Sequence, residues 1–408
     1  MEFFDLPRQL EPNDVEAYAS EWLQLLIRWV HLITGIAWIG ASFYFVFLDN
    51  SLLPPKRKED ADAGIGGELW AIHGGGFYHA QKFKVAPDEL PAPLHWFKWE
   101  AYWTWISGFA LFVVMYYAHA QIYMIDRSVA DIAPWQAIAL SVALLVVGWV
   151  FYDQLCKRLG LEREKPLAAI MIVFFTAVAW SLSHVYSGRA MFLQVGAMMG
   201  TIMAWNVYFV IIPAQRKLVE AKERNAAPDP VYGLQGKQRS VHNNYLTLPV
   251  LFIMISNHYP LTFGNRFAWL VLIAILLLAA YVRHFFNLRH KGRTVWAIPV
   301  SAGIATLLLA IAIAPGKSAQ SAYTFADVER IVATRCATCH AAKPTQPGFN
   351  DPPKGLLLDT PALIVANAQK INEQAVVSKV MPIGNLTNMT DAERATLAAW
   401  IAAGGPAK

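Results

Sequence analysis

Residues 267–286 read Phe-Ala-Trp-Leu-Val-Leu-Ile-Ala-Ile-Leu-Leu-Leu-Ala-Ala-Tyr-Val-Arg-His-Phe-Phe, and the only strongly polar side chains in this run are the arginine and histidine near its end. A helix needs about 20 predominantly apolar residues to cross the hydrocarbon core of a bilayer. The whole chain has a similar character, with 56% apolar residues, 15 tryptophans and a mean hydropathy of +0.34. The sequence therefore predicts a membrane protein.

Eight such runs occur in the chain, and together they predict an all-α bundle of eight transmembrane helices over residues 22–314. In chain order they are Trp22 to Leu48, Trp96 to Ala120, Pro134 to Leu155, Pro166 to Tyr186, Met191 to Ile212, Asn244 to His258, Phe267 to Phe286 and Val295 to Ala314. The sixth is the shortest. We expect no cleavable signal peptide, because residues 1–21 are polar and acidic and the first run is long enough to span.

The segment after the bundle carries the motif Cys336-Ala337-Thr338-Cys339-His340. Two cysteines at this spacing, followed at once by a histidine, are typical of covalent attachment of a c-type haem, with His340 as an iron ligand. A redox dithiol or half of a zinc site is the alternative. No further Cys or His follows His340, so the zinc alternative lacks ligands. The third cysteine, Cys156, lies far away at the end of an apolar run.

A methionine sulfur is the expected second axial ligand of such a haem. Met381 is the preferred candidate, because Pro382 breaks helix and keeps this segment extended. Met389 is the competitor, but it precedes a predicted helix whose N-cap is Thr390, with Glu393 three residues later. Residues 323–408 are therefore predicted to form a small class I cytochrome c domain, joined to the bundle by a linker at residues 315–322.

Basic residues gather in alternate connections between the apolar runs. They are Lys56, Arg57 and Lys58, then Lys157, Arg158, Arg163 and Lys165, then Arg216, Lys217, Lys222, Arg224, Lys237 and Arg239, and last Arg289, Lys291 and Arg293. The positive-inside rule assigns these connections, including a long loop at residues 49–95, to the cytoplasm. Residues 1–21 and the haem domain are then periplasmic, in a multi-pass protein of a bacterial inner membrane. The net charge of +5 comes from these loops and does not indicate nucleic-acid binding.

One cytoplasmic segment has the residue types of a site for a flat, polar ligand. Three glycines separate His73 from His79, and an aromatic run from Leu94 to Trp105 contains Lys98 and Glu100. Glycine permits a close approach of the backbone, and aromatic rings can stack on a planar molecule. The simpler interpretation is an ordinary turn followed by an interfacial aromatic belt.

Histidines within or near the runs are candidate ligands for one or two b-type haems, because facing histidines in helical bundles hold such haems. His31, His184 and His258 form an outer layer, and His242 and His284 lie in an inner layer. His119 is better explained as an interfacial side chain. Residues at helix ends can equally sit in the headgroup zone and bind nothing.

Over its whole length the chain resembles the bacterial membrane-bound urate oxidases, or urate hydroxylases, which carry a C-terminal cytochrome c. The resemblance rests on the segments His73 to His79, Leu94 to Trp105, His242 to Phe252, Ser256 to Pro260 and the Cys336 motif. It implies oxidation of urate to 5-hydroxyisourate, with electrons passed to the fused haem and on to a soluble cytochrome c or terminal oxidase without peroxide release. The candidate catalytic residues are His73, His79, Lys98 and Glu100.

Two other functions fit the residues. A quinol-oxidising membrane cytochrome would deliver electrons to a periplasmic acceptor, and a transporter or assembly anchor would carry the cytochrome only as a tethered electron carrier. If urate is oxidised on the cytoplasmic side, electrons must cross a hydrocarbon core of about 30 Å, which is the reason to expect b haems as a relay. Oxidation at the periplasmic face would need no relay.

Overall fold

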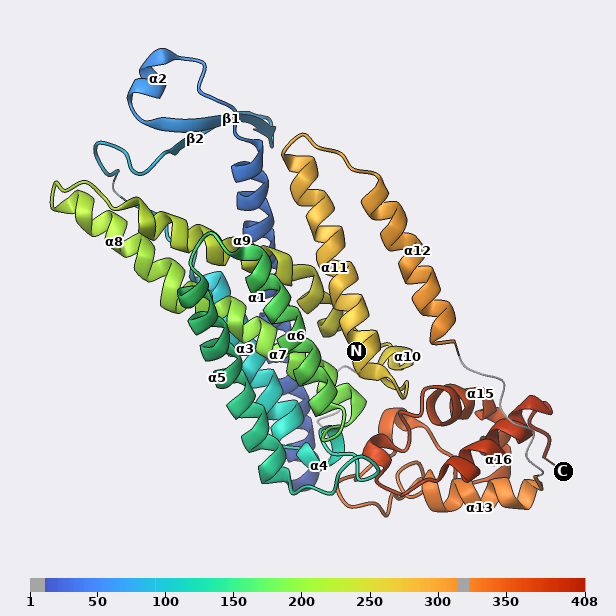
Figure 1. The fold of residues 1–408 in the computed structure, drawn as a ribbon. Coiled ribbons are helices and arrows are strands. Elements are labelled where there is room, and N and C mark those ends of the chain that lie inside the picture. The colour runs from blue at the N-terminus through green and yellow to red at the C-terminus, as the bar shows by residue number, and fades with distance from the viewer. Residues whose placement is uncertain (1–11, 92, 315–322, 408) are drawn as a thin grey trace, which may run out of the picture.

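The computed structural model describes residues 12–91, 93–314 and 323–407, and helices dominate these segments. Figure 1 shows a bundle of long helices with a β-hairpin at one end and a small helical domain at the other. The predicted linker at residues 315–322 and the first part of the predicted N-terminal segment, residues 1–11, lie outside the described residues.

Each of the eight apolar runs lies mostly in helical structure. The bundle consists of α1 (Pro12–Ser51), α3 (Trp99–Phe112), α5 (Pro134–Leu159), α6 (Glu164–Leu182), α7 (Gly188–Asn206), α9 (Pro230–Ser256), α11 (Ala268–His290) and α12 (Ala297–Ala312). π-Helical turns extend α3 through η1 (Val113–Tyr117) and join α7 through η2 (Val207–Ile211) to α8 (Ile212–Glu223). In the described residues, five helical segments are long and apolar enough to cross a membrane.

The helix containing the sixth run is much longer than predicted. It begins at Pro230, where the Asp229 side chain accepts a hydrogen bond from the Val231 amide, instead of at Asn244. Its first half carries Lys237 and Arg239, which hydropathy alone assigns to a loop. The prediction that Arg239 is a loop charge is wrong: its side chain is buried, because it forms an ion pair inside the bundle.

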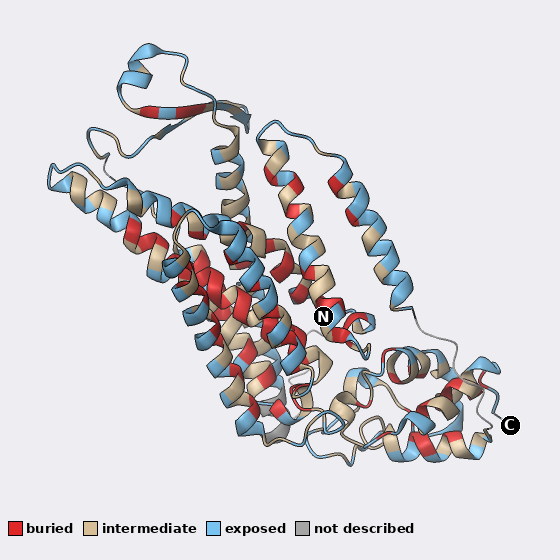
Figure 2. Cartoon of the chain, in the orientation of Figure 1, coloured by how far each residue is buried: buried red, intermediate tan, exposed pale blue. Residues whose placement is uncertain are grey.

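Burial differs strongly between the bundle helices. α7 is central, with buried side chains on most of its turns (Figure 2), whereas α12 exposes large apolar side chains such as Leu307, Leu308 and Ile311. Helices of soluble proteins bury an apolar stripe and expose polar residues. Exposed apolar faces on long helices are therefore compatible with a surrounding bilayer.

The segment predicted as a long loop at residues 49–95 contains a short helix, α2 (Lys58–Asp62), and a β-hairpin. The antiparallel strands are β1 (Ile65–His73) and β2 (Gly76–Phe83). The all-α prediction is wrong here, because these strands are rich in aromatic and β-branched residues that favour a pleated sheet. Gly74 and Gly75 form the two-residue turn with φ of 56° and 82°. A type I′ hairpin turn requires positive φ at both central residues.

Residues 323–407 fold into a second helical unit. Its helices are α13 (Phe325–Arg335), α14 (Pro361–Ala366), α15 (Ala368–Ile371) and α16 (Asp391–Ala402). The predicted capping box is confirmed: Thr390 accepts from the Glu393 amide, and the Glu393 carboxylate accepts from the Thr390 amide. Val328, Ile331, Leu397 and Trp400 form the core between α13 and α16.

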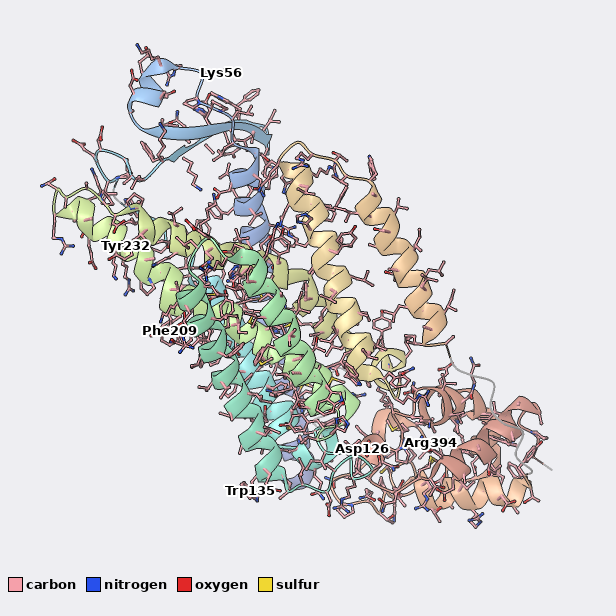
Figure 3. The ribbon with its side chains drawn as sticks, viewed as in Figure 1. Lys56, Asp126, Trp135, Phe209, Tyr232 and Arg394 are labelled. Atoms are coloured by element: carbon pink, nitrogen blue, oxygen red, sulfur yellow. The ribbon has the colours of Figure 1, made fainter. Side chains whose placement is uncertain are left out.

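This unit packs closely against one end of the bundle. A Cβ atom added at Gly264, just after α10 (Pro260–Phe263), would lie 1.9 Å from the Ser378 carbonyl oxygen. One added at Gly384 would lie 2.7 Å from the Ile125 carbonyl oxygen, beside α4 (Ala120–Tyr123). Val380 also packs against the bundle core. Figure 3 shows Asp126 next to this contact, with Arg394 in the facing unit.

Candidate functional site

The Cys336 motif begins where α13 ends. Cys336 is the C-cap of that helix, and the amides of Cys339 and His340 donate to its carbonyl oxygen at 3.1 and 2.9 Å. This tight turn brings two free thiols and an imidazole onto one short segment. Burial raises the pKa of the Cys336 thiol to about 12, and the pKa of Cys339 is also raised. Both sulfurs therefore remain protonated thiols at neutral pH.

The geometry of His340 leaves one ring nitrogen available to a metal. Its Nδ1 lies 3.0 Å from the Leu356 carbonyl oxygen, which can only accept, so Nδ1 carries the proton. Nε2 then has a free lone pair, as in histidines that ligate metals through one nitrogen while the other bonds a carbonyl. Burial also lowers the pKa of His340, against the opposing effect of the Leu356 carbonyl, and this favours the neutral ring.

The two candidate methionines lie in different surroundings. Met389 is 4% exposed, and both its amide and its carbonyl bond the Asn385 side chain. Met381 is half-buried, lies outside the helices, and packs with Cys336 and Leu356 around the same core. Arg394 donates to the Met381 carbonyl at 2.7 Å. Met389 is thus fixed as a core residue beside α16, and Met381 is the better candidate for a sulfur that faces a bound group.

The predicted cytoplasmic cluster is divided between two elements. His79 on β2 stacks on Trp70 at 4.2 Å, and its Nε2 bonds the Glu68 carboxylate at 2.8 Å. The pKa of Glu68 is lowered, first by the Lys56 amide and then by His79. His73 lies at the hairpin turn, paired with Gly76.

Lys98 and Glu100 lie instead at the start of α3. The Lys98 ammonium lies 5.4 Å from the centre of the Trp99 ring, and His95 packs edge-on against Phe97. Among the described residues, no hydrogen bond links His73 or His79 to Lys98 or Glu100. The one close acid–imidazole pair of the hairpin joins His79 to Glu68, a residue that the sequence analysis did not select.

Two candidate b-haem histidines of the outer layer each bond a backbone carbonyl through Nδ1. His31 Nδ1 lies 3.0 Å from the Thr104 carbonyl, and His184 Nδ1 lies 2.8 Å from the Trp180 carbonyl, which leaves Nε2 of each ring free. Gly108 allows the His31 ring to approach α3, since a Cβ there would lie 2.8 Å from it. However, α1 packs against α3, α9 and α11, whereas α6 packs against α5, α7 and α11. A haem shared by His31 and His184 would need directly facing helices.

The remaining candidates differ from one another. Both ring nitrogens of His242 are occupied, Nδ1 by the Tyr152 hydroxyl and Nε2 by Glu164, each at 2.7 Å. His242 therefore offers no free nitrogen to iron in this arrangement. His284 bonds Tyr245 through Nδ1 at 2.7 Å, and His258 is exposed.

His242 belongs to a polar network inside the bundle that the sequence analysis missed. Arg239 pairs with Asp153 at 2.8 Å and lies over the Tyr152 ring at 4.8 Å, and the Tyr152 hydroxyl accepts from Asn206. The network borders a pocket of about 430 Å³ between α5, α8 and α9. Its lining includes three aromatic and three cationic side chains, Trp149, Phe209, Tyr232, Lys157, Lys217 and Arg239. Figure 3 shows Phe209 and Tyr232 far from Arg394 of the second unit.

A second buried network links α9 and α11. The Asn244 side-chain oxygen accepts hydrogen bonds from Arg283 at 3.0 Å and from Asn287 at 2.9 Å. The sequence indicates this network only through the presence of polar residues within apolar runs. Such residues are costly in a membrane and are usually functional. Histidines were selected on that basis, but their asparagine and arginine neighbours were not.

Comparison with known proteins gives one match. A sequence model of the family described as urate oxidase N-terminal matches residues 17–314. No curated protein matches the chain, and no solved structure matches it. The matched range covers the bundle and the hairpin and ends before the Cys336 motif.

Proposed function

The chain belongs to the urate oxidase N-terminal family, and we propose that it oxidises urate to 5-hydroxyisourate at a membrane and delivers the electrons to a c-type haem on residues 323–407. Family membership indicates an oxidoreductase that acts on urate. The observation that carries the finer proposal is the close contact of the family-matched bundle with the unit that contains Cys336, Cys339 and His340.

The residues of the second unit fit a c-type haem. Cys336 and Cys339 would form the thioether links, His340 would ligate the iron through the Nε2 that its bond to Leu356 leaves free, and Met381 would be the second ligand. When bound, such a haem supplies a one-electron acceptor. The partly buried apolar side chains around Cys336, among them Leu356 and Val376, provide an apolar surface for the macrocycle.

The oxidation of urate determines which groups the protein must supply. Urate and one water molecule together give 5-hydroxyisourate, two protons and two electrons. With a metal-centred acceptor in place of dioxygen, no peroxide is formed. The protein must bind the planar urate anion, remove a proton and orient water. His73, His79, Lys98 and Glu100 remain our candidates on the hairpin side, with Glu68 orienting His79.

We propose that electrons flow from the hairpin end of the bundle to the unit at its other end. The hairpin and the basic connections lie at one end of the bundle, and the haem unit lies at the other. This supports a multi-pass protein of the bacterial inner membrane, with eight spans, a cytoplasmic hairpin and a periplasmic haem unit. One or two b haems would bridge the core, with His31, His184 and His258 as outer-layer candidates. A soluble cytochrome c or a terminal oxidase would be the final acceptor.

The test uses the full-length protein purified in detergent, with its c haem oxidised and dioxygen excluded. Added urate should reduce the haem, with one 5-hydroxyisourate formed per two electrons, and a ubiquinol analogue should not reduce it. A variant with Cys336→Ala and Cys339→Ala should lose covalent haem and urate turnover together. Reduction by quinol with no response to urate would make the protein a quinol-oxidising cytochrome instead.

A further inference from the structure

Buried polar atoms without a hydrogen-bond partner are concentrated at one place in the bundle. Seven such side-chain atoms occur among the described residues, and four of them belong to Asn244, Arg283, Asn287 and His290. We call these four residues the Arg283 cluster. An unpaired buried polar group costs free energy comparable to a lost hydrogen bond. Four of them together indicate that a polar ligand completes the site.

The charge of the cluster indicates what kind of ligand it would bind. Arg283 is 4% exposed and lies about 10 Å from the end of α11, at 1.5 Å per helical residue. Within the described part of the chain, its guanidinium forms no ion pair. A buried cation without a counter-charge is strongly unfavourable. The other buried bundle arginine, Arg239, is neutralised by Asp153.

The hydrogen bonds within the cluster determine which side-chain atoms remain unpaired and would contact a ligand. Arg283 Nε can only donate, so the Asn244 atom that receives it at 3.0 Å must be Oδ1, and the free amide atom is the donor Nδ2. Asn287 faces the same oxygen at 2.9 Å and must therefore present Nδ2, which leaves its Oδ1 free. The unused groups of these three residues are thus two donors, Arg283 Nη2 and Asn244 Nδ2, and one acceptor, Asn287 Oδ1, beside the unpaired His290 Nδ1.

Aromatic rings border the cluster on the side of α1. The Arg283 guanidinium lies 4.0 Å from the centre of the Phe43 ring, and His290 packs edge-on against Phe47 at 5.4 Å. Arg283, Asn287 and His290 follow each other at intervals of four and three residues, so they share one face of α11. Donors, an acceptor, a positive charge and aromatic rings therefore meet between α1, α9 and α11.

We propose that the Arg283 cluster binds the urate anion. This inference rests on the proposed function, because it takes urate as the substrate. Urate is planar, is a monoanion near neutral pH, and carries alternating carbonyl acceptors and N–H donors around its edge. Its carbonyl oxygens would accept from Arg283 Nη2 and Asn244 Nδ2, and a ring N–H would donate to Asn287 Oδ1. The negative charge of urate would balance the positive charge of Arg283. This places recognition of the urate anion inside the bundle, on the hairpin side, and leaves proton removal and water orientation to the hairpin candidates.

The decisive variant is Asn244→Asp. It keeps the oxygen that accepts from Arg283 and Asn287, supplies a permanent negative charge beside Arg283, and removes the free Nδ2 donor. The ligand-free protein should unfold at a higher temperature than the wild type, while urate should bind at least about tenfold more weakly, since a charge-assisted hydrogen bond is lost. Stability and affinity should thus change in opposite directions.

Binding is measured on the full-length protein with its haem chemically reduced, so that urate is not consumed. The shift in thermal unfolding is followed by tryptophan fluorescence against urate and against hypoxanthine, a neutral purine of similar shape. Wild type should respond to urate at far lower concentrations than to hypoxanthine. Arg283→Lys should weaken urate binding, and Arg289→Gln, an exposed arginine on the same helix, should not.

The outcomes separate this inference from the proposed function. If urate does not reduce the wild-type c haem, the proposed function fails. If it does, and Asn244→Asp and Arg283→Lys bind and oxidise urate like the wild type, the cluster is not the substrate site. Loss of non-covalent haem from these variants would also overturn the inference, because the missing anion would then be a haem propionate.

Discussion

The contact between Gly264 and Ser378 gives a quantitative test of how the two units are joined. A Cβ at Gly264 would lie 1.9 Å from the Ser378 carbonyl oxygen, whereas ordinary van der Waals contact begins at 3.4 Å. Gly264→Ala must therefore separate the surfaces by about 1.5 Å or distort them. Alanine readily adopts the Gly264 φ of −79°, so the effect is steric. The added Cβ would also lie 2.9 Å from the Pro260 carbonyl oxygen of α10, so part of the cost falls within the bundle.

Overpacking of this kind costs about 1–3 kcal/mol. Applied to the docked arrangement, that corresponds to a shift of about 5- to 150-fold in the ratio of docked to undocked protein. We expect urate-dependent reduction of the c haem to slow several-fold in Gly264→Ala, while reduction by dithionite stays unchanged. Hydrogen exchange should increase at residues 120–125 and 378–384, which meet in this contact.

Gly303→Ala is the matched control, because nothing lies within 4 Å of a Cβ at that position. It lies in α12 and should leave both measurements unchanged or stabilise the helix slightly. Wild-type rates and wild-type exchange in Gly264→Ala would refute the reasoning. Such a result would mean that the two units do not meet through this contact in solution.

The remaining predictions concern the haem ligand and the hairpin. Met381→Ala should keep covalent haem but lose the methionine–iron charge-transfer band and lower the haem reduction potential. Met389→Ala should keep that band and destabilise the unit by about 2–5 kcal/mol, because Met389 is buried in its core. The reverse pattern would exchange the two roles. Because the folded pKa of Glu68 lies below its ordinary 4.5, its contribution to hairpin stability should be complete above that pH and be lost as the pH falls through the lower folded value. Hydrogen exchange of residues 65–83 measured down this pH range should show that loss in the wild type, and an equal loss in Glu68→Gln would contradict the assignment.

The sequence predicted those features that depend on neighbouring residues. Apolar runs located the bundle helices, and Thr390 with Glu393 located the start of the last helix, because span length and capping are local properties. The hairpin was missed because its glycines were assigned to a ligand loop and not to a turn with two positive φ values. Hydropathy averaged over a window also hid the polar first half of α9.

The interior polar groups could not be predicted from the sequence for a different reason. Asn244 and Arg283 are 39 residues apart, and Tyr152 and His242 are 90 apart, so their pairing depends on how helices pack. A single sequence shows that a polar residue lies in an apolar run, but not which atom of it remains unpaired. The missing counter-charge of Arg283 therefore became visible only with the three-dimensional arrangement.

The contact between the units also bears on how residues 323–407 would accept electrons. Ser378 and Gly384 both touch the bundle, and Met381, the candidate sulfur ligand, lies between them on the same segment. The segment that would ligate the iron is thus the segment that fixes the unit in place.

A tethered carrier that moves away from the bundle to meet a distant partner would have to break this contact in every cycle of electron transfer. A docked acceptor that receives electrons from the bundle at the Met381 edge would keep it, and the close packing at Gly264 and Gly384 favours that arrangement. The Gly264→Ala variant distinguishes a docked acceptor from a tethered carrier. Slower reduction of the c haem by urate would indicate a docked acceptor. An unchanged rate of reduction with increased amide hydrogen exchange would indicate a tethered carrier.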